Sequence, residues 1–358
     1  MSPISRKLKS VGLIMKSLKL MKQVGVLLTI AFIVLCCSCS PPKPIEYEYT
    51  ELFPDGWKPV GINNKGEVVG AVYDANGVFS KGFIYSNGEF TEPLPDGWQS
   101  AGVRAINDNG GVVGGGVDAS GVIKIFIYSN GEFTELLPDG WQNAYDAWDI
   151  NNNGEVVGNG VDTNRVLKFF IYSNGEFTEL LPDGLEDPQA YHINNNGTVA
   201  GYGEDANGLL KFFIYSNEKY TIISQPYGVS NFCEVVDIND SGDFVVWLSL
   251  FETCGLDCSG NSFIYSNGKY TELVPRGVRN FRALAMNNNG DVIGKGYDKN
   301  TGGYKHYIYY NDGTYREVML AVAGGLYESV VDINDYGEIT GFVWPNNGPY
   351  KGFIAVPK

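Results

Sequence analysis

Residues 62–70 read Ile-Asn-Asn-Lys-Gly-Glu-Val-Val-Gly, and close copies of this stretch return along the chain. The leading pair, Ile-Asn or once Met-Asn, occurs seven times, at Ile62, Ile106, Ile150, Ile193, Ile238, Met286 and Ile333. Successive copies are 44, 44, 43, 45, 48 and 47 residues apart. Self-similarity at such a period is typical of repeat architectures, in which each repeat is one supersecondary unit.

Each repeat contains four strand candidates separated by turn residues. In the first complete repeat, these strands run into Ile62, through Val68-Val69-Gly70, through Phe83-Ile84-Tyr85, and from Glu89 onward. Asn87-Gly88 joins the last two strands and suits a type I′ hairpin turn, which would set Tyr85 opposite Phe90. Four antiparallel strands in a repeat of this length match one propeller blade. We therefore expect an all-β, seven-bladed β-propeller with four-stranded antiparallel blades over residues 45–358.

The two ends of the repeat array favour a closed ring over an open solenoid. The chain after residue 45 enters with Tyr49-Thr50-Glu51-Leu52, which resembles the fourth strand of a repeat. The last repeat stops after its third strand, Phe353-Ile354-Ala355, and has no fourth strand. We expect the N-terminal strand to complete the last blade and close the ring, because closure removes both exposed sheet edges.

These landmarks resemble the HAF-type extracellular repeat family, in which Ile-Asn-x-x-Gly-x-Val-Val-Gly is followed by a His-Ala-Phe strand. The resemblance covers residues 45–358 and is close at 62–70, 150–158 and 193–201. It departs in the third strand, where Lys81-Gly82-Phe83 and its equivalents mostly carry Lys in place of His. The resemblance implies a propeller fold and an extracellular setting, and it supplies no catalytic residues.

The N-terminal segment has the pattern of an export signal. Basic residues and no acids precede an apolar run from Val24 to Leu35, which ends in Cys36-Cys37-Ser38-Cys39. That run is short for a membrane span, and Cys directly after it is typical of a bacterial lipoprotein signal. We predict a signal peptide over 1–39, lipidation of Cys39 or alternatively Cys37, and a linker over 40–44. Plain secretion is the other interpretation.

Charge and cysteine content limit the partners and the compartment. Without residues 1–39 the chain keeps 20 basic and 41 acidic residues, a net charge of −21. Such a surface repels phosphate backbones, so no nucleic acid partner is expected. Cys254 and Cys258 could close a small disulfide loop in an oxidising compartment, and free buried thiols are the alternative. We expect an exported monomer, lipid-anchored at the cell envelope or extracellular.

The candidate ligand-binding residues lie around the predicted mouth of the central channel. One group is aromatic, and it could stack on sugar rings or simply fill the gaps between blades: Trp57, Trp98, Trp141, Tyr145, Trp148 and Tyr191. A second group lies four residues before the Ile-Asn landmark, where the repeats vary: Lys58, Gly102, Asp146, Gln189, Glu234, Arg282 and Ser329. Variation on a uniform scaffold is where binding specificity can be encoded.

No catalytic, metal or cofactor site is predicted. The two histidines, His192 and His306, are isolated in sequence. The turn after Asp149 superficially resembles an acidic calcium loop, but it offers mainly amides, which turn formation explains. The sequence therefore favours a non-catalytic surface module that binds glycan or protein at the channel face. A surface polysaccharide lyase or hydrolase, using acids or the Tyr191–His192 pair, is the alternative.

Overall fold

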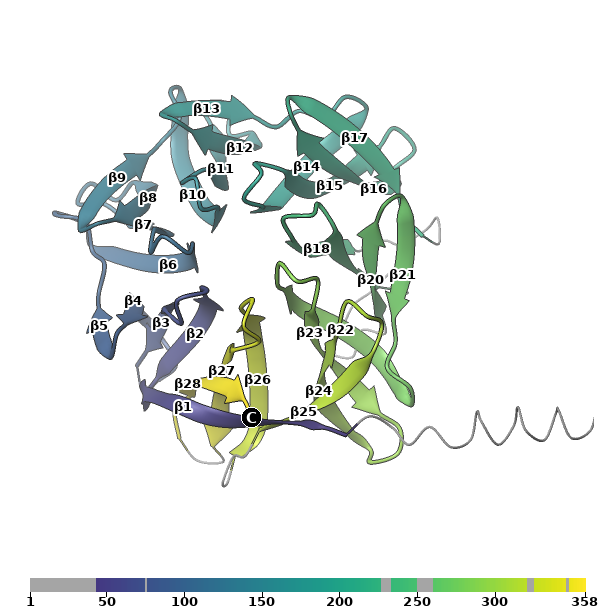
Figure 1. Cartoon of the computed structure of the whole chain (residues 1–358). Helices are drawn as coiled ribbons and strands as arrows, with labels where there is room; N and C mark the ends of the chain where they lie inside the picture. The colour runs from purple at the N-terminus through teal and green to yellow at the C-terminus, as the bar shows by residue number, and fades with distance from the viewer. Residues whose placement is uncertain (1–42, 75, 227–232, 250–259, 321–324, 346–347) are drawn as a thin grey trace, which may run out of the picture. The chain divides into compact units, whose positions relative to one another are not determined.

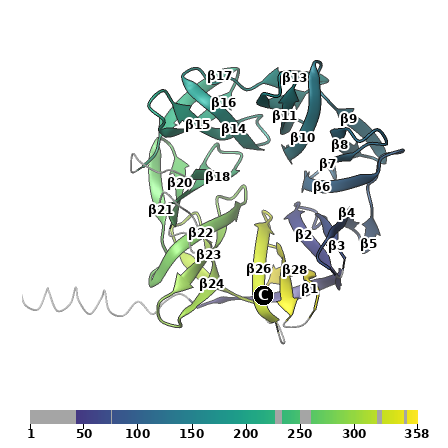
Figure 2. The same cartoon turned by 180° about the vertical axis from the view of Figure 1, so that it is seen from behind.

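The computed structural model describes residues 43–74, 76–226, 233–249, 260–320, 325–345 and 348–358. Residues 44–358 form one compact unit, whose described part contains 28 strands and no helix. The strands form four-stranded antiparallel blades arranged as a β-propeller, as the sequence predicted (Figures 1 and 2). The predicted signal peptide, with Cys37 and Cys39, and the disulfide candidates Cys254 and Cys258 lie outside the described residues.

Four of the sheets are separate and have four strands each, hydrogen-bonded in sequence order. The first contains β6 (Ser100–Ile106), β7 (Val112–Val117), β8 (Ile123–Ser129) and β9 (Glu132–Leu136). The second contains β10 (Trp141–Ile150), β11 (Val156–Asp162), β12 (Leu167–Ser173) and β13 (Glu176–Glu179). The third contains β14 (Leu185–Ile193), β15 (Val199–Asp205), β16 (Leu210–Ser216) and β17 (Lys219–Ser224). The fourth contains β18 (Cys233–Ile238), β19 (Phe244–Ser249), β20 (Gly260–Ser266) and β21 (Lys269–Leu273).

The other twelve strands join into one mixed sheet, where separate blades were expected. One antiparallel group contains β22 (Val278–Met286), β23 (Val292–Asp298), β24 (Gly303–Tyr309) and β25 (Tyr315–Leu320). Another contains β26 (Gly325–Ile333), β27 (Ile339–Pro345), β28 (Lys351–Pro357) and β1 (Ile45–Asp55). The third contains β2 (Trp57–Ile62), β3 (Val68–Tyr73), β4 (Phe79–Ser86) and β5 (Glu89–Thr91).

Short parallel contacts link these three groups. The N-terminal end of β1 pairs with β25 over Ile45–Tyr47, and β2 meets β28 at the single residue pair Trp57–Lys351. The rest of β1 pairs antiparallel with β28, with Tyr49 opposite Ala355 and Leu52 opposite Phe353. The sheet is continuous because β1, with 11 residues, is longer than the predicted strand and reaches the preceding group.

The hairpin turns set the register that the Asn-Gly pairs predicted. Asn87 and Gly88 have φ values of 53° and 83°, the left-handed conformation of a type I′ turn. Tyr85 lies opposite Phe90 with ring centroids 5.0 Å apart. The same aromatic pair recurs at Tyr128–Phe133, Tyr172–Phe177, Tyr215–Tyr220 and Tyr265–Tyr270.

The hydrophobic core lies between neighbouring blades, which explains the repeated motifs. The first aromatic of the third-strand landmark is buried throughout, at Phe83, Phe126, Phe170, Phe213, Phe263, Tyr307 and Phe353. In five repeats this ring lies against a Gly of the preceding strand, whereas Phe263 lies opposite Val246. A Cβ atom on Gly70 would lie 2.3 Å from the Lys58 carbonyl oxygen and 2.5 Å from the Phe83 ring. The Val-Val-Gly motif is therefore a packing requirement.

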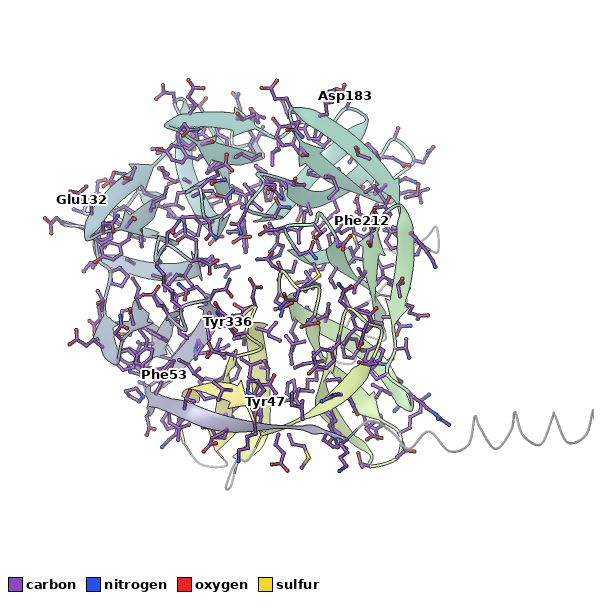
Figure 3. All side chains as sticks on the ribbon, in the orientation of Figure 1. Tyr47, Phe53, Glu132, Asp183, Phe212 and Tyr336 are labelled. Carbon is purple, nitrogen blue, oxygen red and sulfur yellow. The ribbon has the colours of Figure 1, made fainter. Side chains whose placement is uncertain are left out.

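Within each blade the four strands are ordered from the centre of the molecule to its periphery. Each blade therefore presents its first strand to the central channel. Figures 1 and 2 both show β6, β10, β14 and β18 toward the centre, with β9, β13, β17 and β21 at the periphery. In Figure 3, Glu132 of β9 and Asp183, beyond β13, lie at the outer edge. Phe212 of β16 is fully buried between two blades. The innermost strands therefore decide which side chains face the channel.

Candidate functional site

A β-bulge occurs at an equivalent place in the first strand of each sequence repeat. In β14, for example, Ala190 and His192 pair with adjacent residues of β15, and Tyr191 is the extra residue between them. The extra residues, in chain order, are Val60, Arg104, Trp148, Tyr191, Val236, Leu284 and Val331. A bulge redirects side chains out of strict alternation, and bulges are common beside functional sites.

The bulge residues form much of the wall of a central cavity of about 800 Å³. Its lining comes from β2, β6, β10, β14, β15, β18 and β22, and includes six of the seven bulge residues. Gln189, Glu234 and Arg282, three of the variable positions before the landmark, line it as well. A cavity of this size is within the range of about 300–1,000 Å³ typical of small-molecule sites.

One wall of the cavity is aromatic and held by hydrogen bonds. The Trp148 and Tyr191 rings meet edge to face with centroids 4.8 Å apart, and Tyr202 lies 6.1 Å beyond Tyr191. The hydroxyls of Tyr191 and Tyr202 both donate to Gln189 Oε1, at 2.5 and 2.8 Å. Burial raises the pKa of both tyrosines, so their hydroxyls stay protonated as donors. The wall is therefore preorganised.

Two arginines of the cavity have different environments. Arg282 stacks on Trp247 at 4.9 Å, and its Nη2 donates to Glu234 Oε2 at 2.8 Å. Arg104 stacks on Trp148, with Cζ 4.2 Å from the ring centroid. Among the described residues, no carboxylate lies within 4 Å of the Arg104 guanidinium. The Arg104 charge is thus not neutralised by an ion pair in the described part of the chain.

Next to the bulge along the chain, three aspartates and one histidine lie close together. Asp149, Asp237 and Asp332 each accept the backbone N–H of the next innermost strand, from Ile193, Met286 and Ile62 respectively, at 2.8–3.0 Å. His192 Nδ1 lies 3.8 Å from Asp149 and 3.9 Å from Asp237. In the other repeats, smaller or neutral residues stand at the equivalent position. Each Asp joins two neighbouring strands of the channel wall through its hydrogen bond.

Burial governs the protonation of these three aspartates and of His192. It raises the pKa of Asp149 to about 6 and that of Asp332 to about 7, and it raises the pKa of Asp237 well above its ordinary value. Repulsion among the three carboxylates adds to the rise. Burial, with the Arg104 charge, lowers the pKa of His192 to about 4, so its contacts with the acids are those of a neutral imidazole.

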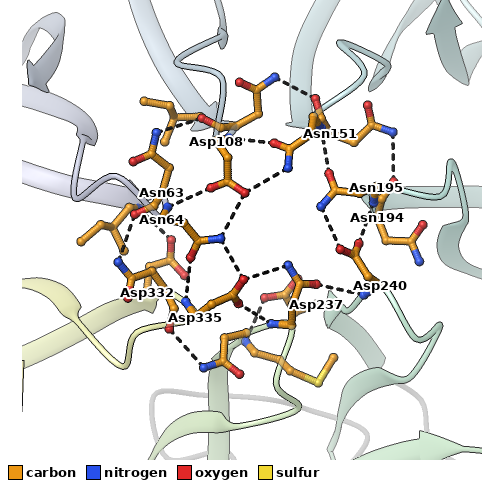
Figure 4. Close-up of a pocket in the computed structure, with 18 of the residues that line it drawn as sticks. Asn63, Asn64, Asp108, Asn151, Asn194, Asn195, Asp237, Asp240, Asp332 and Asp335 are labelled. Carbon is orange, nitrogen blue, oxygen red and sulfur yellow. Dashed lines mark hydrogen bonds between the residues drawn. The ribbon is translucent and has the colours of Figure 1, made fainter.

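The narrow end of the channel is a ring of amide and carboxylate side chains (Figure 4). The Asn of the Ile-Asn landmark is buried and holds its own turn, since Asn63 Oδ1 accepts from the N–H groups of Lys65 and Glu67. Its Nδ2 donates to the Asn107 carbonyl oxygen of the following repeat at 2.9 Å. Equivalent bonds start from Asn107, Asn151, Asn194, Asn287 and Asn334.

A second circle of hydrogen bonds involves the residue after the landmark Asn. In each repeat its backbone N–H donates to the side-chain Oδ1 of the equivalent residue in the next repeat, at 2.7–2.9 Å. The members are Asn64, Asp108, Asn152, Asn195, Asp240, Asn288 and Asp335, and Asp335 donates back to Asn64. These side chains are occupied in joining repeats, so the narrow end is structural. Figure 3 shows Tyr336, which follows this ring, toward the centre.

The structure brings together some of the sequence-predicted residues and separates others. Trp148, Tyr191, Gln189, Glu234 and Arg282 all line the central cavity. Asp146 lies on β10 nearby, where burial raises its pKa and the Arg104 charge acts against the rise. Lys58 places its ammonium 4.6 Å from the Phe342 ring, away from the cavity lining.

Trp57, Trp98 and Trp141, each of which follows the sequence Pro-Asp-Gly, do not line this cavity. Trp57 packs on Phe83 and Phe90, and Trp98 packs on Phe126 and is only 7% exposed. Trp141 packs on Phe170 and lines a separate cavity of about 570 Å³ with residues of β13. Tyr145 is exposed and is not part of the central lining. The three tryptophans pack in apolar clusters that join residues of neighbouring blades.

Sequence reasoning missed Arg104, Tyr202 and Cys233 as residues of the cavity lining. Arg104 could have been found, because residues two apart on a strand share a face and Arg104 stands two after the variable position Gly102. Tyr191 and His192, which the sequence offered as a pair, both line the cavity because the bulge puts consecutive residues on one side. Cys233 is a free thiol in the lining, and burial raises its pKa to about 12.

In the described ranges, no group of three or more His, Cys, Asp or Glu side chains is placed to hold a metal ion. In the same ranges, no helix has the length and apolar character needed to cross a membrane.

The fold and the channel define a β-propeller, and comparison with known proteins agrees at that level. The β-propeller domain of the Trilobed protease from Pyrococcus furiosus aligns with a TM-score of 0.57 and 13% identity, over 84% of this chain and 97% of that one. The acylaminoacyl peptidase of Pyrococcus horikoshii aligns with a TM-score of 0.56 and 11% identity, over 83% of this chain. This chain spans about half of that peptidase, 51% of its length.

At these identities the likeness shows the propeller scaffold alone. The chain matches no protein-family model and no curated protein sequence. The function must therefore be argued from the channel itself.

Proposed function

We propose that this chain is a non-catalytic binding module that holds a glycan in its central channel. The observation that carries the proposal is the cavity of about 800 Å³, in which aromatic, amide and arginine side chains from separate blades converge. Concave sites with a few placed polar groups on a largely apolar wall are the usual form of small-ligand sites. The amide ring at the other end surrounds a smaller space of about 160 Å³, and its side chains are used in hydrogen bonds between repeats. We therefore expect the glycan to enter from the wider cavity.

Sugars fit this wall better than purely apolar ligands. Trp148, Tyr191 and Tyr202 give flat surfaces for the C–H faces of sugar rings, while Gln189 and the arginines supply hydrogen bonds to hydroxyls. Gln189 Oε1 is occupied by two tyrosine hydroxyls, which leaves its Nε2 as the group that donates outward.

A glycan array probed with the purified protein tests the proposal. Trp148→Ala should weaken binding of any glycan hit at least about tenfold, because it removes an aromatic anchor and the support of Arg104. Trp344→Ala is the matched control, since Trp344 is 50% exposed and lies outside the cavity lining. Equal loss in both variants, or no glycan bound by the wild type, would contradict the proposal.

A glycan-cleaving enzyme, a lyase or hydrolase, is the second candidate. One observation favours it: the bulge turns both Tyr191 and His192 toward the same cavity. His192 is neutral above pH 4 because burial lowers its pKa to about 4. Its unprotonated ring nitrogen can therefore act as a base that abstracts a proton. Release of shorter oligosaccharides from a bound glycan, lost in His192→Ala, would favour this candidate over simple binding.

We propose further that the twelve-stranded sheet comprises three blades, which makes a seven-bladed ring closed by β1. Its antiparallel pairings divide into three groups of four, and only four parallel residue pairs link the groups. The pairing of β1 with β28 and the circle of seven hydrogen bonds from Asn64 to Asp335 support closure. Closure joins the chain's first and last strands in one blade, as the terminal motifs predict.

Export and lipid anchoring remain proposals that rest on the N-terminal motif. Metabolic labelling with a palmitate analogue should mark the protein, and Cys39→Ala should remove the label. Retained label in that variant would move the modified residue to Cys37, and an unlabelled wild type would contradict the lipid anchor.

A further inference from the structure

We propose that the glycan bound in the channel contains uronic acid, and that Arg104 binds the sugar carboxylate. This inference rests on the proposed glycan-binding function and names the chemical class of the ligand. It starts from the contrast between the two arginines of the cavity, one paired with an acid and the other not.

Arg104 is held ready to bind an anion. It is the bulge residue of β6, and its guanidinium is stacked on the indole of Trp148 at 4.2 Å. Stacking fixes the plane of the guanidinium and leaves its edges free, the geometry that suits a bidentate bond to a carboxylate. The chain has 41 acidic against 26 basic residues. An arginine that keeps no carboxylate within 4 Å among the described residues of such a chain favours an external anion.

The other titratable groups near Arg104 are neutral, paired or not in contact with it. Glu234 is occupied by Arg282 at 2.8 Å, and His192 is neutral. Asp146, on the neighbouring β10, is half-buried and makes no ion pair with Arg104 among the described residues. The lining therefore carries one unpaired positive charge beside a polar aromatic wall.

Two further polar groups of the wall are donors, which matches a ligand rich in acceptors. Gln189 uses its oxygen on two tyrosines, so only its Nε2 donors remain. The Trp148 indole N–H is buried and has no hydrogen-bond partner among the described residues. A buried donor without a partner is costly, and ligand or water commonly satisfies it. A uronate presents carboxylate, ring and hydroxyl oxygens as acceptors, together with a sugar face that can lie against Tyr191 or Tyr202.

Binding of acidic oligosaccharides and their methyl esters tests the proposal. The probes are oligomers of galacturonate, glucuronate and mannuronate, the methyl esters of the same oligomers, and neutral oligomers of equal length. Wild type should bind at least one acid oligomer about tenfold or more tightly than its ester, because a charge-assisted bidentate pair is lost on esterification. The affinity for the acid should also fall with rising salt.

Arg104→Gln should bind acid and ester equally, whereas Arg104→Lys should keep part of the preference. Arg279→Gln is the matched control, because Arg279 also stacks on an aromatic ring, Tyr297 at 4.4 Å, outside the cavity lining. The selectivity ratio reports the carboxylate contact, and a merely structural role of Arg104 would not move it.

The outcomes separate this inference from the proposed function. Equal binding of acid, ester and neutral oligomers would overturn the uronate inference and leave glycan binding intact. An acidic peptide that outcompetes every glycan, or an unchanged acid preference in Arg104→Gln, would also overturn it. If no glycan binds at all, both proposals fail.

Discussion

At the residue scale, glycines of the second strands give the third-strand aromatic rings room to lie against the sheet. The Val-Val-Gly motif ends where the third-strand aromatic ring lies against the backbone. At Gly114 an added Cβ atom would lie 2.0 Å from the Gly102 carbonyl oxygen and 2.8 Å from the Phe126 ring. Both neighbours are fixed, one as strand backbone and the other as a fully buried ring. The position therefore leaves no room for a side chain.

Gly114→Ala should destabilise the protein by about 1–3 kcal/mol or more, the usual cost of overpacking a close-packed site. Gly303→Ala is the control, because its added Cβ would meet nothing within 4 Å and its backbone φ is not in the left-handed region. We expect the control to change the unfolding free energy by no more than about 0.5 kcal/mol. Denaturant unfolding of the two variants checks this, and similar losses in both would show that crowding is not the cause.

At the element scale, the innermost strands are joined by half-buried aspartates as well as by the sheets. Asp149, Asp237 and Asp332 each accept a backbone N–H from the next innermost strand and another from the residue that follows them. The side chains of Asp149 and Asp237 are about a quarter exposed, at 24% and 23%, toward the channel. Their protonation is thus coupled to the contacts between blades.

Stability should fall as pH rises from about 5 to 8. The folded protein keeps protons on Asp149 and Asp332 up to pH values of about 6 and 7, whereas an unfolded Asp releases its proton near pH 4. In this window the folded state binds more protons, so the free energy of unfolding decreases with pH. The loss is of the order of 1–3 kcal/mol per group.

Melting temperatures measured from pH 5 to 8 check the effect. The double variant Asp149→Asn with Asp332→Asn should show a smaller fall over that range, whatever its absolute stability. A wild-type melting temperature that rises across the window would contradict the protonation scheme.

At the scale of the whole molecule, the N-terminal strand is expected to hold the ring together. β1 pairs with β28 along most of its length and buries Tyr47 and Phe53, which are 1% and 3% exposed. Loss of this strand would expose the edge of β28 and the apolar surface beneath it.

A chain that starts at residue 56 should therefore be unstable or aggregate, because the loss approaches the usual margin of about 5–15 kcal/mol. Moving residues 45–55 behind Lys358 through a short turn should restore it, since Tyr47 already lies opposite Pro357. A chain starting at residue 44 is the control, because it keeps all 28 strands. Thermal melting and size-exclusion chromatography check these chains. A truncated chain that melts like the control and stays monomeric would argue for an open array.

The sequence by itself determined the propeller class, the four-stranded blade and the hairpin register. These features depend on local patterns: the repeat length, the alternation of apolar residues and the φ > 0 turns at Asn-Gly pairs. It also predicted the pairing of Tyr49 to Leu52 with the last strand, because the two ends of the array complement one another. The sequence left open whether Trp57, Trp98 and Trp141 bind ligand or fill gaps between blades.

Only the tertiary structure decided which side chains share the channel. The bulge puts Tyr191 and His192, neighbours in sequence, into one cavity and so breaks the alternation on which a strand pattern depends. It also sets Arg104 against Trp148, 44 residues away in the next repeat, without an acid partner among the described residues. Contacts between repeats depend on the angle between neighbouring blades, and no local sequence pattern encodes that angle. For this reason the channel chemistry appears only when the ring is assembled.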